Sequence, residues 1–250
     1  MDTNSNQARR VVIGITAHVD AGKTTLAEAM LYRTGRLRKL GRVDHGSAAM
    51  DSHLLERERG ITIFSSQAEL PIGDLEVTLL DTPGHVDFSA EMERTLSVLD
   101  YAILVISGAD GVQAHTRTLW RLLELYRIPT FLFVTKMDFG RCDRGQMMEH
   151  LRHELGEGCV DFTPADRERR MEQLATCRED ALEAYLDGGE VPDALVRQLV
   201  GRRLVFPCWF GSGLKLEGID EFLEGLARYV EPPVYPETFS ARVFKISTPA

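Results

Sequence analysis

The stretch AHVDAGKTT, residues 17–25, has the residue types and spacing of a loop that binds phosphate groups. The usual pattern is Gly, four residues and then Gly-Lys-Ser/Thr; Gly22, Lys23 and Thr24 match it, whereas Ala17 stands at the first position. Lys23 is expected to reach the β- and γ-phosphates in a binding and catalytic role, and the Thr24 hydroxyl is expected to bind Mg²⁺. Backbone N–H groups before a helix form an anion site, so the predicted phosphate contacts are Asp20, Ala21, Gly22, Lys23, Thr24 and Thr25.

Two points about this loop stay open. Asp20 either only shapes the turn or helps to hold a cation or a water molecule near the phosphates. A chance Gly-Lys-Thr at a helix start is the alternative to a phosphate loop. The apolar run before the loop and the helical pattern after it argue against chance.

A second group of candidate residues lies in LLDTPGHVDF, residues 79–88. Asp81 closes an apolar stretch, where phosphate-binding proteins place a carboxylate for the metal, often through water. Gly84 has no side chain to obstruct the approach of its backbone N–H to a γ-phosphate. A lone histidine such as His85 is usually a surface residue, but beside a γ-phosphate it can orient the attacking water. We therefore predict a metal role for Asp81, a nucleotide contact for Gly84 and a catalytic role for His85.

Thr62, in the stretch GITI at residues 60–63, is a third candidate. It can supply a second hydroxyl to Mg²⁺, after that of Thr24, and a backbone carbonyl or amide near the γ-phosphate. Alone, the stretch is equally typical of a strand start, but its position between the phosphate loop and Asp81 favours a catalytic and metal role. A loop ordered only by γ-phosphate and metal would act as a switch.

The stretch FVTKMD, residues 133–138, has the residues of a base-recognition turn. A carboxylate at Asp138 can accept hydrogen bonds from N1–H and the 2-amino group of guanine, which adenine does not offer, so discrimination of roughly 10⁴ is attainable. Lys136 can lay its alkyl stem along the face of the base. Backbone N–H groups in FGSGLK, residues 210–215, can reach the base O6. The predicted base contacts are Thr135, Lys136, Asp138, Ser212, Gly213 and Leu214.

These candidates follow apolar runs that predict strands buried on both faces. The runs cover residues 11–16, 76–81, 102–107, 130–135 and 204–210. Helical patterns lie at about 23–34, 89–99, 113–127, 143–155, 167–186, 192–201 and 218–229. Their alternation predicts an α/β fold, with a mostly parallel sheet covered by helices on both faces and ligands at the carboxyl ends of the strands.

The chain divides into one large domain and short flanking segments. Residues 1–10 are predicted to be an N-terminal tail, and 11–230 a nucleotide-binding domain with a small helical insertion at about 156–200. EPPVYPE, residues 231–237, is a proline-rich linker. Residues 238–250, which alternate like a strand, are expected to begin a truncated second domain of β-barrel type.

Composition narrows the partners. The net charge of −9 over 250 residues argues against a protein that coats nucleic acid, and no DNA partner is expected. The apolar runs are too short to span a membrane, the N-terminus lacks a signal peptide, and the cysteines show no metal spacing, so we expect a cytoplasmic protein without a membrane partner. RTGRLRKLGR, residues 33–42, is either a solvated helix end or a loop that touches phosphates on a partner.

The motifs together resemble the GTPase domain of translational GTPases. The supporting stretches are AHVDAGKTTL, VDHGSAAMDSHLLERERGITI, DTPGHVDF, SVLDYAILVISGADGVQAHTR and EGIDEFL. The details resemble the elongation factor G class, and most closely the tetracycline-resistance ribosomal protection proteins. Elongation factor G itself carries a sizeable subdomain between the two base motifs, whereas only about 70 residues separate Asp138 from Ser212 here.

This resemblance implies binding of GTP and GDP with Mg²⁺, and hydrolysis switched on by the ribosome. By matching positions, Lys23 and Thr24 hold phosphate and metal, Thr62 is the switch threonine, and His85 positions the water molecule. In the family this histidine is arranged by the sarcin–ricin loop of the large-subunit ribosomal RNA. The resemblance also implies tetracycline release from the ribosome by the full-length protein.

The sequence is also compatible with other functions. The protein is alternatively an elongation factor G paralogue without a resistance role, a metabolic phosphate-loop enzyme, or a nucleotide-gated module that hydrolyses nothing. Thr135 stands where the base motif usually has Asn, which bonds the base N7 and ties the turn to the phosphate loop. Thr is expected either to keep one of these contacts or to use a water molecule, and the loss of one neutral hydrogen bond costs on the order of 1 kcal/mol.

Overall fold

The computed structural model describes residues 9–38, 66–82, 89–139, 142–163, 167–234, 238, 241 and 243. Seven strands form one sheet: β1 (Arg9–Ala17), β2 (Ser66–Ile72), β3 (Leu75–Asp81), β4 (Tyr101–Ser107), β5 (Thr130–Thr135), β6 (Cys159–Asp161) and β7 (Phe206–Phe210). Their spatial order is β2-β3-β1-β4-β5-β7-β6, and only the β2–β3 pair is antiparallel. The carboxyl ends of β1, β3, β4, β5 and β7 therefore meet at one edge, as the sequence predicts.

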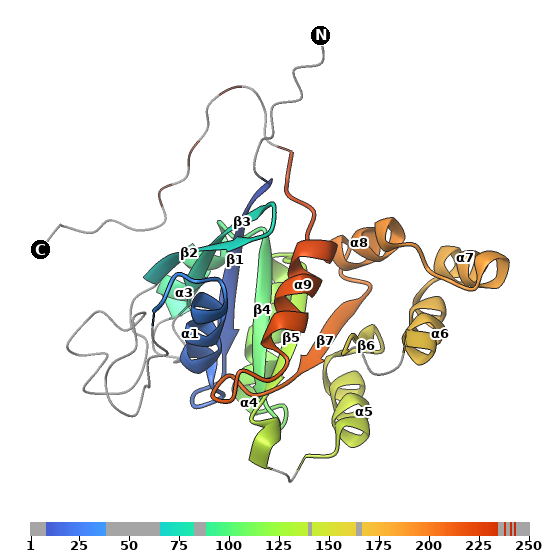
Figure 1. Cartoon of the computed structure of the whole chain (residues 1–250), viewed down its shortest axis with the longest axis horizontal. Helices are drawn as coiled ribbons and strands as arrows, with labels where there is room; N and C mark the ends of the chain where they lie inside the picture. The colour runs from blue at the N-terminus through green and yellow to red at the C-terminus, as the bar shows by residue number, and fades with distance from the viewer. Residues whose placement is uncertain are drawn as a thin grey trace, which may run out of the picture.

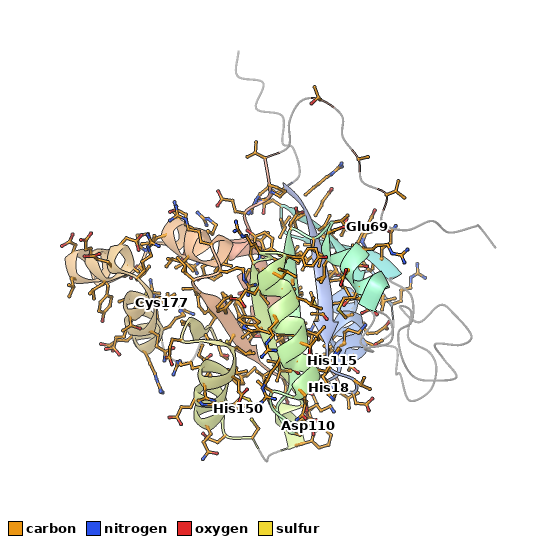
Figure 2. All side chains as sticks on the ribbon, turned by 180° about the vertical axis from the view of Figure 1, so that it is seen from behind. His18, Glu69, Asp110, His115, His150 and Cys177 are labelled. Atoms are coloured by element: carbon orange, nitrogen blue, oxygen red, sulfur yellow. The ribbon has the colours of Figure 1, made fainter. Side chains whose placement is uncertain are left out.

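Helices cover both faces of the sheet (Figure 1). They are α1 (Lys23–Arg33), α3 (Ser89–Leu96), α4 (Ala114–Leu125), α5 (Arg144–Leu155), α6 (Arg167–Cys177), α7 (Glu179–Gly188), α8 (Asp193–Gly201) and α9 (Ile219–Tyr229). A short 3₁₀ turn, η3 (Met137–Phe139), follows β5. Helices α1 and α9 lie on the face nearest the viewer in Figure 1, and α4 lies on the opposite face, which Figure 2 shows from behind.

The central strands bury both faces because their side chains alternate between two cores. In β4, Ile103 and Val105 pack into the core under α1 and α9, whereas Leu104 and Ile106 pack into the core under α4 and α5. Each of these side chains is at most 1% exposed. Continuous apolar runs are thus the expected sequence signal for these strands, and the α/β prediction is confirmed.

The region of the predicted insertion contains one strand as well as helices. The short strand β6 pairs in parallel with β7 and so belongs to the sheet. The predicted helix at 167–186 is wrong as a single element, because α6 and α7 are separated at Arg178, which has extended backbone angles (φ −162°, ψ 153°). Glu179 and Asp180 then lie in the first turn of α7, where acidic side chains interact favourably with the helix dipole.

The chain ends and the cysteines complete the description. Strand β1 begins at Arg9, inside the predicted tail. Residues 231–234 of the predicted linker are neither helix nor strand, and most of the predicted second domain lies outside the described residues. All four cysteines are free thiols; Cys159 and Cys208 are buried, and burial raises the pKa of Cys177 to about 11. Within the described part of the chain, no helix has the length and apolar character needed to cross a membrane.

Candidate nucleotide-binding site

The predicted phosphate loop connects β1 to α1 and is shaped for an anion. The Ala21 N–H donates to the His18 carbonyl at 3.1 Å, and Gly22 at the helix N-cap has a φ of 91°, which favours glycine. Asp20 also has a positive φ of 60°, so it takes part in the turn. No side chain caps α1, and its first turn holds no acidic residue. The N–H groups at its start can therefore serve a negatively charged ligand.

Ala17 does not disturb this loop. It is the last residue of β1, it is 1% exposed, and it packs into the core beneath α1. Ala17 does not have a positive φ, so this position does not require glycine. The departure from the usual phosphate-loop pattern therefore costs no backbone strain.

Lys23 and Asp81 form the centre of the site. The Lys23 ammonium contacts the Asp81 carboxylate and donates to the Thr82 carbonyl at 2.5 Å. Lys23 is 9% exposed and Asp81 is fully buried. The Thr82 N–H and hydroxyl both donate to the Ile15 carbonyl, at 3.1 and 2.8 Å, and so fix the end of β3 beside β1. The predicted phosphate lysine and the predicted metal carboxylate are thus in direct contact.

Thr135 ties the predicted base-recognition turn to the predicted phosphate loop. Its hydroxyl oxygen lies 2.5 Å from the Ala21 carbonyl oxygen and 3.1 Å from that of Ile106. The side chain is 3% exposed. Since a hydroxyl has one proton to donate, both carbonyls compete for it. Of the two contacts attributed to the usual Asn, Thr135 retains the one to the phosphate loop.

The base-recognition turn itself is held by backbone contacts. Lys136 has a φ of 59°, and the Met137 N–H donates to the Gly211 carbonyl at 3.2 Å, which joins this turn to the loop after β7. The side chain of Asp138 is 11% exposed and lies 3.7 Å from the Lys215 ammonium. Lys215 is not among the predicted site residues, although it directly follows GSGL, residues 211–214, which include the predicted base contacts. The Lys215 ammonium thus lies beside the carboxylate that is predicted to contact the base.

The loop after β7 packs against the start of α1. Ser212 and Glu217 exchange two backbone hydrogen bonds of 3.0 Å, which close the loop. A side chain at Gly213 would place its Cβ 3.1 Å from the Thr25 carbonyl, so only glycine allows this close approach without a shift. Leu214 is 48% exposed. The predicted O6 contacts therefore lie beside the start of α1.

Two histidines near the predicted phosphate loop are likewise not among the predicted site residues. His18 follows Ala17, and His115 lies in the first turn of α4; their ring centroids are 5.9 Å apart. Figure 2 shows the two side chains together at the lower end of the sheet. Neither spacing nor periodicity links them, because the fold alone brings 18 and 115 together.

Most of the predicted site residues converge at one edge of the sheet. Those that the structure describes at or beside the loops after β1, β3, β5 and β7 are Asp20, Ala21, Gly22, Lys23, Thr24, Thr25, Asp81, Thr135, Lys136, Asp138, Ser212, Gly213 and Leu214. The predicted residues Thr62, Gly84 and His85 lie outside the described part of the chain, so their roles stay predictions.

Curated relatives of this chain carry resistance names. It is 40% identical to the oxytetracycline resistance protein of Streptomyces rimosus over 263 residues, and 35% identical to the tetracycline resistance protein TetO of Campylobacter jejuni over 251. It is 37% identical to TetM from transposon Tn916 of Enterococcus faecalis over 254 residues. Each comparison covers 94% of this chain and 39% of the relative, so the chain spans about two fifths of their length.

Structure and family comparisons identify the fold and the family of the chain. A protein of Thermus thermophilus with a known crystal structure matches with a TM-score of 0.80 at 28% identity, over 90% of this chain and 41% of the other. The family model described as the elongation factor Tu GTP binding domain matches residues 8–232. The chain therefore belongs to the elongation factor Tu GTP binding domain family, and guanine nucleotides are its ligands.

Proposed function

We propose that the intact protein is a ribosome-dependent GTPase of the tetracycline-resistance ribosomal protection type, working in the cytoplasm. It would convert GTP and water to GDP and phosphate and release tetracycline from the ribosome. The observation that carries the GTPase part is the buried contact between Lys23 and Asp81 at the end of the phosphate loop. The resistance names of relatives at 35–40% identity support the protection part. The alternative is an elongation factor G paralogue that acts in translation without a resistance role.

The residues at the phosphate end fit Mg²⁺ as well as phosphate. A threonine hydroxyl and a carboxylate are hard oxygen ligands of the kind that Mg²⁺ prefers. We assign Thr24 and Asp81 to this metal, with Thr62 as the predicted third ligand. The bound metal would neutralise charge on the phosphates, while Lys23 and the uncapped start of α1 hold the phosphate oxygens.

The base end fits guanine. Asp138 would accept from N1–H and the 2-amino group, with Lys136 along the face of the base. The N–H groups of Gly213 and Leu214, in the loop that Ser212 closes, would donate to O6. This arrangement gives N1–H, the 2-amino group and O6 of guanine a partner and leaves adenine with unmatched contacts.

The contacts of Thr135 predict that nucleotide affinity does not depend on N7 of the base. Because its one proton is shared between the carbonyls of Ala21 and Ile106, the Thr135 hydroxyl has no donor left for N7. The chain is expected to bind GDP and 7-deaza-GDP within about twofold of each other. In T135N the amide has two N–H donors, so GDP affinity is expected to rise about tenfold, as for one added hydrogen bond. Calorimetric titration of both ligands measures this.

The same titration contains its own control. Affinity of T135N for 7-deaza-GDP is expected to stay near that of the parent, because this ligand lacks N7. The preference for guanine over adenine is also expected to stay unchanged, since Asp138 is untouched. A parent chain that binds 7-deaza-GDP tenfold more weakly than GDP would contradict the assignment of the Thr135 proton.

We propose that His85 positions the attacking water. We also propose that the large-subunit ribosomal RNA near the sarcin–ricin loop is the partner that arranges this histidine. Replacing His85 by Ala in the full-length protein is expected to lower ribosome-stimulated GTP hydrolysis by at least about a hundredfold, the usual contribution of a positioned acid–base group. GDP affinity is expected to stay the same. Unchanged stimulated turnover would show that this histidine does not act on the water, as in a nucleotide-gated module.

The proposal as a whole is tested on the full-length protein. GTP hydrolysis is measured with and without ribosomes, and then displacement of labelled tetracycline from ribosomes is followed at saturating GTP. Stimulation with displacement supports the protection type. Stimulation without displacement supports the elongation factor G paralogue without a resistance role. A rate of hydrolysis that ribosomes do not change would support a metabolic phosphate-loop enzyme.

A further inference from the structure

A second pocket lies apart from the nucleotide site, between α5, the end of β6 and α6. It has a volume of about 260 Å³. Figure 1 shows these three elements together on the β6 side of the sheet. The polar residues that matter in its lining are Arg144, Arg152, Asp161, Arg169, Arg170 and Gln173. We call this the arginine pocket.

The arginine pocket is strongly positive in a chain of net charge −9. Four arginines face one acidic residue among its described lining residues. That residue, Asp161, is already engaged, because it accepts from Arg144 Nε at 2.5 Å and from the Thr163 N–H at 2.9 Å. The described lining offers no second carboxylate to Arg152 and Arg170, which favours an anionic ligand.

These two guanidinium groups are oriented but incompletely bonded. Arg152 Nε donates to the Cys159 carbonyl at 3.1 Å, while its Nη2 is buried without a hydrogen-bond partner among the described residues. Arg170 donates from Nη1 to the Phe162 carbonyl at 3.3 Å and lies over the Phe162 ring, while its Nε is likewise buried and unbonded in the described chain. Buried donors are nearly always paired in native proteins, so a ligand with several acceptor oxygens fits this place.

Gln173 adds a different requirement. Its Oε1 is buried without a hydrogen-bond partner in the part of the chain that the structure describes, so it needs a donor rather than an acceptor. A carboxylate or a sulfate would satisfy the arginines and leave this oxygen unpaired. RNA supplies both kinds of group, because a 2′-hydroxyl adjoins each backbone phosphate, whereas DNA lacks it.

We propose that the arginine pocket binds a phosphate group of an RNA backbone, with Arg152 and Arg170 on the phosphate oxygens and Gln173 accepting from the neighbouring 2′-hydroxyl. Arginine suits this role because its planar fork matches phosphate geometry. Phosphate contacts of this kind position a protein on RNA without reading its sequence. The identification of this RNA as ribosomal rests on the function proposed above. Phosphate binding by the pocket does not depend on that function.

The test uses small probes on the whole chain, saturated with GDP so that the nucleotide site is filled. Uridine 3′-monophosphate, 2′-deoxyuridine 3′-monophosphate and inorganic phosphate are titrated while amide NMR shifts are followed. Uridine 3′-monophosphate is expected to shift amides of α5 and α6 around Arg152 and Gln173. It is expected to bind about fivefold more tightly than the deoxy form, the effect of one neutral hydrogen bond.

Variants separate the pocket from general charge. Arg152→Gln removes one oriented cation, and Gln173→Glu places a carboxylate against the arginines; each is expected to weaken the ribonucleotide roughly tenfold. The matched control is Arg121→Gln, which removes the same charge from an exposed position on α4. Equal weakening in the control, or no shifts in the parent, would overturn the proposal.

Equal affinity for the ribo and deoxy probes would overturn the assignment to RNA. None of these outcomes involves ribosomes or GTP turnover. A failed titration therefore leaves the proposed GTPase function intact, and failure of ribosome stimulation leaves the phosphate site intact.

Discussion

Replacing Asp138 by Asn is expected to change the preferred base from guanine to xanthine. The affinity for GDP is expected to fall by roughly 10⁴, the scale of discrimination that buried polar groups provide when they lose their partner. The affinity for XDP is expected to rise to within about tenfold of the parent affinity for GDP. Direct titration of the parent and of D138N with GDP, XDP and ADP measures both changes.

The reason lies in the donors and acceptors at position 2 of the base. Guanine offers two donors, N1–H and the 2-amino group, and a carboxylate accepts both. Xanthine has a carbonyl at position 2, so an amide that accepts from N1–H and donates to that oxygen replaces the lost pair. The turn that carries the side chain is fixed by the backbone bond from Met137 to Gly211 and is expected to stay in place.

Folding is not expected to confound this change. The ion pair of Asp138 with Lys215 is long, 3.7 Å, and the lysine side chain is 52% exposed, so its loss is expected to cost at most about 1 kcal/mol. Asp187→Asn, at an exposed position of α7, makes the same charge change away from the site. If D138N lost GDP affinity without gaining XDP, Asp138 would be supporting the loop rather than contacting the base.

The sequence predicts the central strands well because both of their faces are buried. β4 and β5 are continuous apolar runs whose alternate side chains enter opposite cores, so composition alone marks them. β2 is an edge strand with exposed polar side chains and Pro71, which edge positions tolerate. β6 has only three residues. Such strands depend on pairing with their neighbours, a property that a single sequence does not display.

The site divides in a similar way. The sequence could predict that Lys23, Asp81 and Asp138 lie at one edge of the sheet, because each sits at or shortly after the end of a strand. Lys215 beside Asp138 and the pair of His18 with His115 could not, because these contacts arise only when separate loops meet at one edge. The sequence likewise could not show which contact the Thr135 hydroxyl makes. The structure shows it, because the hydroxyl oxygen lies 2.5 Å from the Ala21 carbonyl oxygen.

Replacing Lys23 by Met is expected to have two separable effects. Nucleotide affinity is expected to fall on the order of 10³-fold, because two charge-assisted contacts to phosphates are lost, each contributing about 1.5–3 kcal/mol. The free energy of unfolding without nucleotide is expected to fall by about 3–5 kcal/mol, because the ammonium that faces the fully buried Asp81 carboxylate is gone. Urea titration followed by the fluorescence of the buried Trp120 and Trp209 measures the second effect.

A double variant distinguishes the two effects. In Lys23→Met combined with Asp81→Asn, the buried charge is removed together with its partner, so most of the lost stability is expected to return. Nucleotide affinity is expected to stay low, since neither the phosphate lysine nor the metal carboxylate is present. Unfolding must be measured without nucleotide, because a ligand that binds only the folded chain would add its own stabilisation.

Lys215→Met is the matched control for this pair. It removes the same charge and chain length from a lysine that is 52% exposed and 3.7 Å from its carboxylate, so stability is expected to change by less than about 1 kcal/mol. A single Lys23→Met variant as stable as this control would show that the Asp81 carboxylate does not depend on the ammonium. A double variant that regained nucleotide affinity would show that the single variant binds weakly because its unpaired Asp81 carboxylate disturbs the site, and not because the phosphate lysine is missing. If both expectations hold, Lys23 contributes independently to the fold, through Asp81, and to the ligand, through the phosphates.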